Sequence, residues 1–346
     1  MTTTDPTTSP VRQTVPLGPR WPTIDPFLFC AHHDDAYPAG DDVLAPAVPV
    51  DDRDLGMDFS GQDGWSMYHG LVVPGFPQHP HRGFETVTFV RTGLIDHSDS
   101  LGATARFGRG DVQWLTAGRG IVHAEMFPLL DRSGPNPLEL FQIWLNLPAA
   151  DKMVDPYFTM FWDGDMPVVR SGGAEVTVIA GSLAGSLAGA EAPAPPPDSY
   201  AARPDADIAI LHIRLDPGAA WTLPAAAGSR TARVLYVFEG DTVDTVDIAG
   251  TAVGNDTGVV VDPTADLDLR SGDRQVEILV LQGCPLGEPV AQQGPFVMNT
   301  QAEIQQAFVD FRRTQFGGWP WPDSAPVLGR DPARFARRPD GAVENA

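Results

Sequence analysis

Two pairs of metal-compatible side chains occur in residues 75–126, and within each pair the members are separated by one residue. His79 and His81 form the first pair, and His123 and Glu125 form the second. Successive side chains of an extended strand point to opposite faces, so residues two apart share a face. Each pair therefore offers two ligands from one side of one strand. If the two strands are neighbours, three imidazoles and one carboxylate converge, which predicts a metal site.

The residues between the two pairs have the composition of short antiparallel strands. The runs ETVTFV and VQWL are rich in β-branched and aromatic residues, and glycine turns occur at 91–93, 108–110 and 118–120. Continuing the alternation from His81 also puts Glu85 on the ligand face, unless a bulge at Gly83 resets the phase. Glu85 is therefore a rival to Glu125 as the fourth ligand. Arg82, on the opposite face, is expected to form a salt bridge.

Several long blocks of this sequence resemble one known family. HPHRGFETVTFV and GDVQWLTAGRGIVHAEM resemble signature blocks of the pirin family, which belongs to the cupin superfamily of small β-barrels. LFQIWLNLP, DKMVDP and GCPLGEPVAQQGPFVMNT resemble further pirin blocks in the family's order, so the resemblance covers roughly residues 25–316. It implies an all-β fold: a bicupin of two cupin-type antiparallel β-barrels or sandwiches, with a C-terminal α-helix.

The composition and the resemblance together suggest where the domains begin and end. The expected parts are a flexible Thr/Pro-rich N-terminus (1–20), a metal-binding N-terminal cupin (21–155), a C-terminal cupin without a metal site (156–316) and a loosely held tail (317–346). The C-terminal cupin is expected to include a low-complexity loop (183–200). His212 is the only histidine in this half, so no metal is expected there.

A helix is expected at 300–316, where the apolar period changes. Thr300 and Glu303 have the spacing of a capping box. The apolar residues that follow repeat at helical spacing, which predicts one face packed on a barrel. These residues are Ile304, Ala307, Phe308 and Phe311.

The resemblance implies which residues hold the metal. In pirins the carboxylate comes from the second motif, which points to His79, His81, His123 and Glu125 as ligands. Glu85 then becomes a supporting or strand-pairing residue. One transition-metal ion per chain is expected, and the resemblance suggests iron. The ligand set is also compatible with Mn, Co, Ni, Cu or Zn.

Other histidines receive different expectations. The run at 32–35, His-His-Asp-Asp, could form a second metal site, but adjacent strand side chains diverge, so a solvated loop is preferred. His69 is expected to be structural or part of a pocket wall, and His97 is expected to be exposed in a loop.

Aromatic and polar side chains near the two pairs are candidates for a pocket. Phe84, Trp114 and Met126 could wall the space above the metal. The strand at 138–147 has a mixed face that could also line it, formed by Gln142, Trp144 and Asn146.

The resemblance implies three functional hypotheses. The preferred one is an iron-dependent dioxygenase acting with dioxygen on a chelating enol or flavonol such as quercetin, with Glu125 or Glu85 accepting the enol proton. The first alternative is a metal-dependent regulatory protein that binds a transcription factor or a metabolic enzyme. The second alternative is a non-catalytic bicupin whose metal is structural.

Composition limits the other possibilities. Among the 346 residues, 45 acidic side chains face 23 basic ones, giving a formal net charge of −22. No run supplies the basic face that direct nucleic-acid binding requires. Cys30 and Cys284 lie far apart, which favours a reducing compartment. With no apolar signal core or membrane-length run, the expected location is the cytoplasm.

Overall fold

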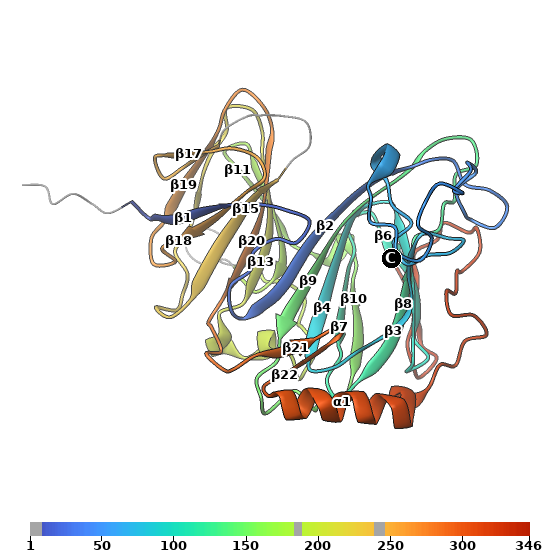
Figure 1. Cartoon of the computed structure of the whole chain (residues 1–346). Coiled ribbons are helices and arrows are strands. Elements are labelled where there is room, and N and C mark those ends of the chain that lie inside the picture. The colour runs from blue at the N-terminus through green and yellow to red at the C-terminus, as the bar shows by residue number, and fades with distance from the viewer. Residues whose placement is uncertain (1–8, 183–188, 239–245) are drawn as a thin grey trace, which may run out of the picture. The chain divides into compact units, whose positions relative to one another are not determined.

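The computed structural model describes residues 9–182, 189–238 and 246–346. The chain divides into two compact units (Figure 1). The histidine unit comprises Ala31–Gly164 and Glu288–Ala346, and the companion unit comprises residues up to Cys30 together with Asp165–Gly287. Residues 1–8 of the expected flexible N-terminus and 183–188 of the expected low-complexity loop lie outside the described residues. Short 3-10 turns occur at Gln62–Gly64, Asp163–Asp165, Tyr200–Ala202, Pro204–Ala206 and Gln315–Gly317.

Two antiparallel sheets form most of the histidine unit. The first has the order β10 (Tyr157–Phe161), β7 (Val112–Thr116), β4 (Phe84–Thr92), β9 (Asn136–Asn146) and β2 (Phe27–Tyr37), with the unit boundary inside β2. The second has the order β24 (Val343–Asn345), β23 (Phe335–Arg337), β6 (Thr104–Gly108), β5 (Leu94–Asp99), β8 (Ile121–Met126) and β3 (Gly75–His81). Alternate side chains from both sheets form one core, including Val90, Ile95, Phe107, Leu115, Leu140 and Phe158.

The companion unit is also built from antiparallel sheets. One has the order β1 (Val11–Pro16), β18 (Thr257–Val261), β15 (Ala232–Phe238), β20 (Val276–Gly283), β13 (Ala209–Leu215), β12 (Ala174–Ala180) and β11 (Val168–Ser171). The other has the order β14 (Ala220–Leu223), β19 (Leu267–Ser271), β16 (Val246–Ile248) and β17 (Thr251–Val253). Its core is mainly aliphatic, and His212 pairs with Glu277 at 2.6 Å. The expectation of two β-units is confirmed.

Gly83 sets the relation between β3 and β4. Its φ is +86°, and a Cβ there would lie 1.9 Å from the carbonyl oxygen of Val297. Only glycine fits this left-handed conformation and close approach. The turn resets the alternation, so that Thr88 of β4 contacts Glu125, whereas Glu85 lies on the other face with Trp114 and Thr116.

The expected C-terminal helix is confirmed as α1 (Gln301–Thr314). Thr300 is its N-cap, and the capping box with Glu303 is present. Ile304 and Ala307 are buried against the hairpin of β21 (Ala291–Gln293) and β22 (Phe296–Met298). In Figure 1, α1 lies across the ends of β3 and β8. The helix therefore belongs to the histidine unit, although the expected boundaries assign it to the C-terminal cupin.

The expectation of a loosely held tail is wrong. The strand β23 pairs with β6. Arg106 is buried and donates Nε and Nη2 to Asp96 at 2.7 Å each, and its Nη2 also donates to the Gly329 carbonyl at 2.7 Å. Arg334 pairs with Asp111 at 2.7 Å. The tail extends the sheet of the histidine unit, because buried arginines and unpaired strand edges find partners there.

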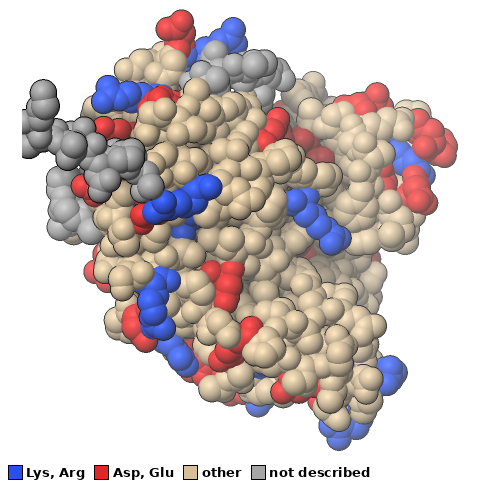
Figure 2. Space-filling model, turned by 60° about the vertical axis from the view of Figure 1, so that its left-hand side comes forward, with Lys and Arg blue, Asp and Glu red and all other residues tan. Residues whose placement is uncertain are grey.

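No helix among the described residues is long and apolar enough to cross a membrane. On the face drawn in Figure 2, arginine side chains are interspersed with acidic and uncharged ones and form no continuous basic patch.

Replacing Gly83 by Ala should destabilise the protein far more than the same change at Gly102. Both glycines have φ near +90°, but a Cβ at Gly102 meets no atom within 4 Å. We expect Gly102→Ala to cost about 1 kcal/mol from backbone strain and Gly83→Ala at least ~3 kcal/mol from strain plus collision. Urea unfolding midpoints measure the difference. Equal costs would contradict the close approach at Gly83.

Candidate metal centre

The antiparallel pairing of β3 with β8 brings three histidines together. His79 lies opposite His123 and His81 lies opposite Ile121, after a bulge between Phe76 and His79. One potential ligand atom from each of the three histidines lies within 4.8 Å of the others. The predicted pairing of neighbouring strands and the convergence of three imidazoles are confirmed.

Backbone carbonyls orient two of these rings. Nδ1 of His79 lies 2.9 Å from the Pro77 oxygen, and Nδ1 of His81 lies 3.4 Å from the Pro295 oxygen. A carbonyl oxygen only accepts, so each Nδ1 carries the hydrogen and each Nε2 keeps its lone pair. Histidine ligands of metals commonly have this arrangement.

His123 shows most directly that the site suits a metal ion. Its side chain is 0% exposed, and neither ring nitrogen has a hydrogen-bond partner among the described residues. Leaving two buried polar atoms unpaired is costly. Burial lowers the pKa of His79 to about 4 and holds the pKa values of His81 and His123 well below their usual range, with neighbouring imidazoles adding to the effect. The rings are therefore neutral, which is the form that binds metals.

Glu125 lies beside the three histidines rather than among them. It shares the inner face of β8 with His123, and its side chain is 4% exposed. Thr88 donates to its Oε1 at 3.2 Å and Gln142 donates to its Oε2 at 3.1 Å. Burial raises its pKa. The structure thus brings together three of the four expected ligands and holds the fourth next to them.

Glu85 is directed away from the histidines. It is fully buried, and its Oε1 accepts hydrogen bonds from Trp114 Nε1 at 3.2 Å and Thr116 Oγ1 at 2.7 Å. The phase reset at Gly83 puts it on the other face of the sheet. Its strand-pairing role agrees with the expectation. From this position Glu85 does not contact the histidines that would bind the metal.

The aromatic wall differs from the expected one. Phe84 lies beside His81, with ring centroids 5.0 Å apart, as expected. Trp114 points to the other face with Glu85, and Met126 packs in a separate cluster with Leu44 and Val73. Trp144 completes the wall instead, 5.4 Å from His81. Trp144 belongs to the mixed face of the strand at 138–147, which the sequence analysis named as a possible lining.

His97 was expected to be exposed in a loop, but it is buried in a strand. It lies in β5, is 0% exposed, and its Nε2 lies 3.1 Å from Asp99 Oδ2. Its ring lies 5.6 Å from that of His123, and its Nδ1 has no hydrogen-bond partner among the described residues. His97 and Asp99 repeat the one-residue spacing of the two ligand pairs, which could have identified this strand.

The run at 32–35 is part of strand β2, so the expectation of a solvated loop is wrong. Nδ1 of His33 lies 2.8 Å from the Tyr68 hydroxyl, which donates to Asp35 at 2.7 Å. Burial raises the pKa of Asp35 to about 7, opposed by this bond. His69 has the expected structural role, with Nδ1 2.7 Å from the Gly56 oxygen.

Comparison with known proteins places both halves of the chain in one family. The Pirin model matches residues 8–145, and the model for the Pirin C-terminal cupin domain matches residues 210–317. A Pseudomonas aeruginosa protein provisionally named quercetin 2,3-dioxygenase is 39% identical, over 70% of this chain and 79% of its own length. Pirin-1 of Arabidopsis thaliana is 39% identical, over 70% of this chain and 78% of its own. The crystal structure of a quercetin 2,3-dioxygenase from Acinetobacter baumannii has a TM-score of 0.67 and 25% identity, covering 90% of this chain and 99% of that one.

Replacing His123 by Leu should make the metal-free protein more stable. The change removes two buried nitrogens that lack partners, and we expect a gain of about 1–2 kcal/mol. The same variant should lose the stabilisation that added Fe(II) or Zn(II) gives the unmodified protein. The matched control, His212→Leu, breaks the pair with Glu277 and should lower stability while leaving the metal effect intact. Thermal unfolding with and without chelator checks this. A metal-free His123→Leu protein less stable than its parent would contradict it.

Proposed function

The chain belongs to the pirin family of the cupin superfamily, and from that premise we propose that it is a metal-dependent dioxygenase of flavonol-like enols such as quercetin. The observation that carries the proposal is the convergence of three neutral imidazoles, one of which, His123, has no hydrogen-bond partner for its buried ring nitrogens among the described residues. The similarity to quercetin 2,3-dioxygenases supports this reaction class. We propose iron as the ion, although the donor set is also compatible with Mn, Co, Ni, Cu and Zn.

The residues that would hold the ion are His79, His81 and His123 through their Nε2 atoms, with Glu125 as the carboxylate. When bound, the ion would polarise the enol and carbonyl oxygens of the substrate and support their reaction with dioxygen. The carbonyl oxygens of Pro77 and Pro295 keep the first two rings in the tautomer that binds metals.

Glu125 is the proposed proton acceptor. Burial raises the pKa of its carboxyl group in the metal-free protein, and a positioned carboxylate is a group that can accept an enol proton. Thr88 and Gln142 contact its two oxygens at 3.2 and 3.1 Å, which fixes their orientation towards the inner face. Glu85, on the other face of β4, has no part in the proposed mechanism.

An aromatic wall beside the centre supports a planar aromatic substrate. The rings of Phe84 and Trp144 lie 4.2 Å apart, and both contact the ring of His81. Such a pair can stack against an aromatic ring and exclude water from the reacting oxygens.

A regulatory role is the second candidate, and one observation favours it. Large apolar side chains are exposed along residues 43–72, a concentration that can mark a protein contact. They are Val43, Val48, Leu55, Met57, Phe59, Leu71 and Val72. A partner protein would bind this segment, and its affinity would depend on whether the centre holds a metal ion.

Oxygen uptake after anaerobic loading with Fe(II) tests the enzymatic proposal. We expect uptake that requires quercetin and that is lost together with the metal in His123→Ala. Glu125→Gln should lower kcat by about 10²–10⁴-fold. Glu85→Gln, which keeps an acceptor for Trp114 and Thr116, is the matched control and should retain activity. If fully loaded protein consumed no oxygen with quercetin or related enols, the proposal would fail and regulation would become the better account.

A further inference from the structure

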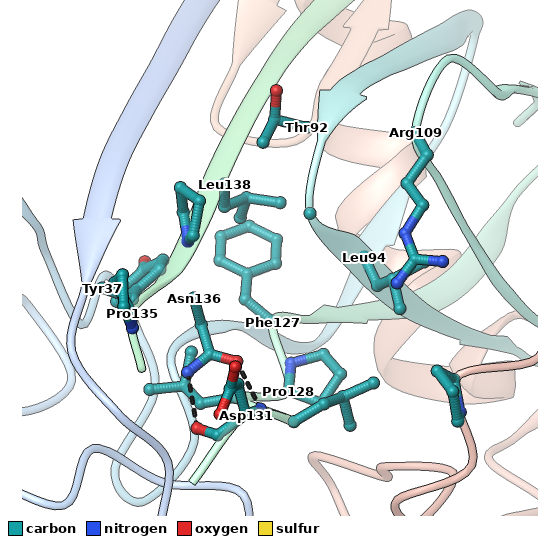
Figure 3. A pocket seen from close by; sticks show the side chains of 15 residues that line it. Tyr37, Thr92, Leu94, Arg109, Phe127, Pro128, Asp131, Pro135, Asn136 and Leu138 are labelled. Atoms are coloured by element: carbon teal, nitrogen blue, oxygen red, sulfur yellow. Dashed lines mark hydrogen bonds between the residues drawn. The ribbon is translucent and has the colours of Figure 1, made fainter. Parts of the chain in front are cut away.

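A cavity in the histidine unit lies apart from the metal centre. It has a volume of about 260 Å³ (Figure 3). The end of β4, the start of β9, residues 127–131 and the turn at 108–110 surround it. None of the three converging histidines lines it, nor does Glu125. The metal chemistry therefore does not explain the cavity.

Most of the residues that line this cavity are apolar, beside several polar ones. Leu94, Phe127 and Leu138 present hydrocarbon surface, and the hydroxyl of Tyr37 is already committed to the Ser66 carbonyl at 2.7 Å. Four prolines also line it, namely Pro128, Pro135, Pro137 and Pro332. Proline fixes its own backbone angle, so a wall rich in prolines loses little freedom when a ligand enters.

Among the residues that the structure describes, Arg109 is the one cationic side chain that lines the cavity. It is exposed and has no hydrogen bond or ion pair to any described residue. Its backbone is nevertheless fixed. Its φ is +55°, and its neighbour Gly108 donates to Asp111 at 3.0 Å and accepts from Arg334 at 3.1 Å. The backbone thus holds Arg109 at the cavity, and the donors of its guanidinium are available to a ligand.

Asp131 and Asn136, two of the other polar side chains of the cavity, form hydrogen bonds with the backbone. Asp131 Oδ1 accepts from the backbone of Ser133 at 2.8 Å and of Gly134 at 3.0 Å. The amide of Asn136 bonds to the backbone of Asp131 and Pro38, and Figure 3 shows this pair at the foot of the cavity. Arg109 is the cationic group of this lining that can pair with an anionic ligand, and the Thr92 hydroxyl is a further polar group beside it.

We propose that this cavity binds a small monocarboxylate with an aromatic or other apolar body. The carboxylate pairs with the guanidinium of Arg109, whose planar fork matches two carboxylate oxygens. The body packs against Phe127 and Leu138. The Arg109 guanidinium can offset one negative charge, and the Asp131 carboxylate in the same lining disfavours a second, so a monoanion suits the cavity better than a doubly charged phosphate. The proposal is independent of the reaction assigned to the metal centre.

Calorimetric titration of the full chain with 3-phenylpropionate and its neutral amide tests this proposal. The carboxylate should bind about tenfold more tightly than the amide, and Arg109→Gln should abolish that difference. Arg313→Gln removes the same charge from exposed α1, where Arg313 pairs with Asp310 at 3.3 Å, and should leave the difference unchanged. Thr92→Trp, which fills the cavity from its rim, should abolish binding of both probes.

Four results would overturn the proposal: no binding of the carboxylate at millimolar concentration, equal binding of carboxylate and amide, an equal effect of Arg313→Gln and Arg109→Gln, or undiminished binding to Thr92→Trp. Circular dichroism of each variant establishes that it is folded. Because these titrations use metal-free protein and measure no oxygen uptake, their failure is distinct from failure of the proposed enzymatic function.

Discussion

The register between β3 and β8 is the constraint on which the candidate centre depends. Pairing His79 with His123 puts the imidazoles of two strands on one inner face, and the barrel core then removes them from water. Desolvation keeps the rings neutral and leaves the nitrogens of His123 without partners among the described residues. A metal ion can bind the lone pair of one of these nitrogens without a large cavity, because an ion occupies little space. The folded protein therefore carries an unfavourable buried polar group that a bound metal would stabilise.

The surrounding elements hold this register from several sides. Gly83 allows β4 to change phase, so Thr88 approaches Glu125 while Glu85 bonds to Trp114. Arg82, as expected, forms a salt bridge: it pairs with Asp310 of α1 at 2.9 Å, and its guanidinium lies 4.5 Å from the Phe316 ring. The helix and tail thereby close the barrel around residues that lie far from them in the sequence.

Patterns of neighbouring residues correctly predicted the features that strand alternation and helix capping determine. The spacing of His79, His81 and His123 predicted their convergence, and the spacing of Thr300 and Glu303 predicted the capping box. Errors arose where a long-range contact decides the outcome. The sequence around His97 is typical of a loop, but the pairing of β5 with β8 makes it a buried strand residue. The tail has the composition of a loose segment, but Arg106 and Asp96 bind it to the sheet. The direction of Glu85 depended on a turn whose geometry is fixed by the distant Val297.

X-ray absorption spectroscopy of protein loaded with one equivalent of Fe(II) tests the central claim most directly. The account predicts an iron site with three imidazole ligands and a carboxylate oxygen, and no sulfur. It also predicts that His79→Ala, His81→Ala and His123→Ala each remove the imidazole signal or the iron, whereas His97→Ala does neither. An iron site with fewer than three imidazoles, or one unchanged in His123→Ala, would contradict the convergence of these three residues on a single ion.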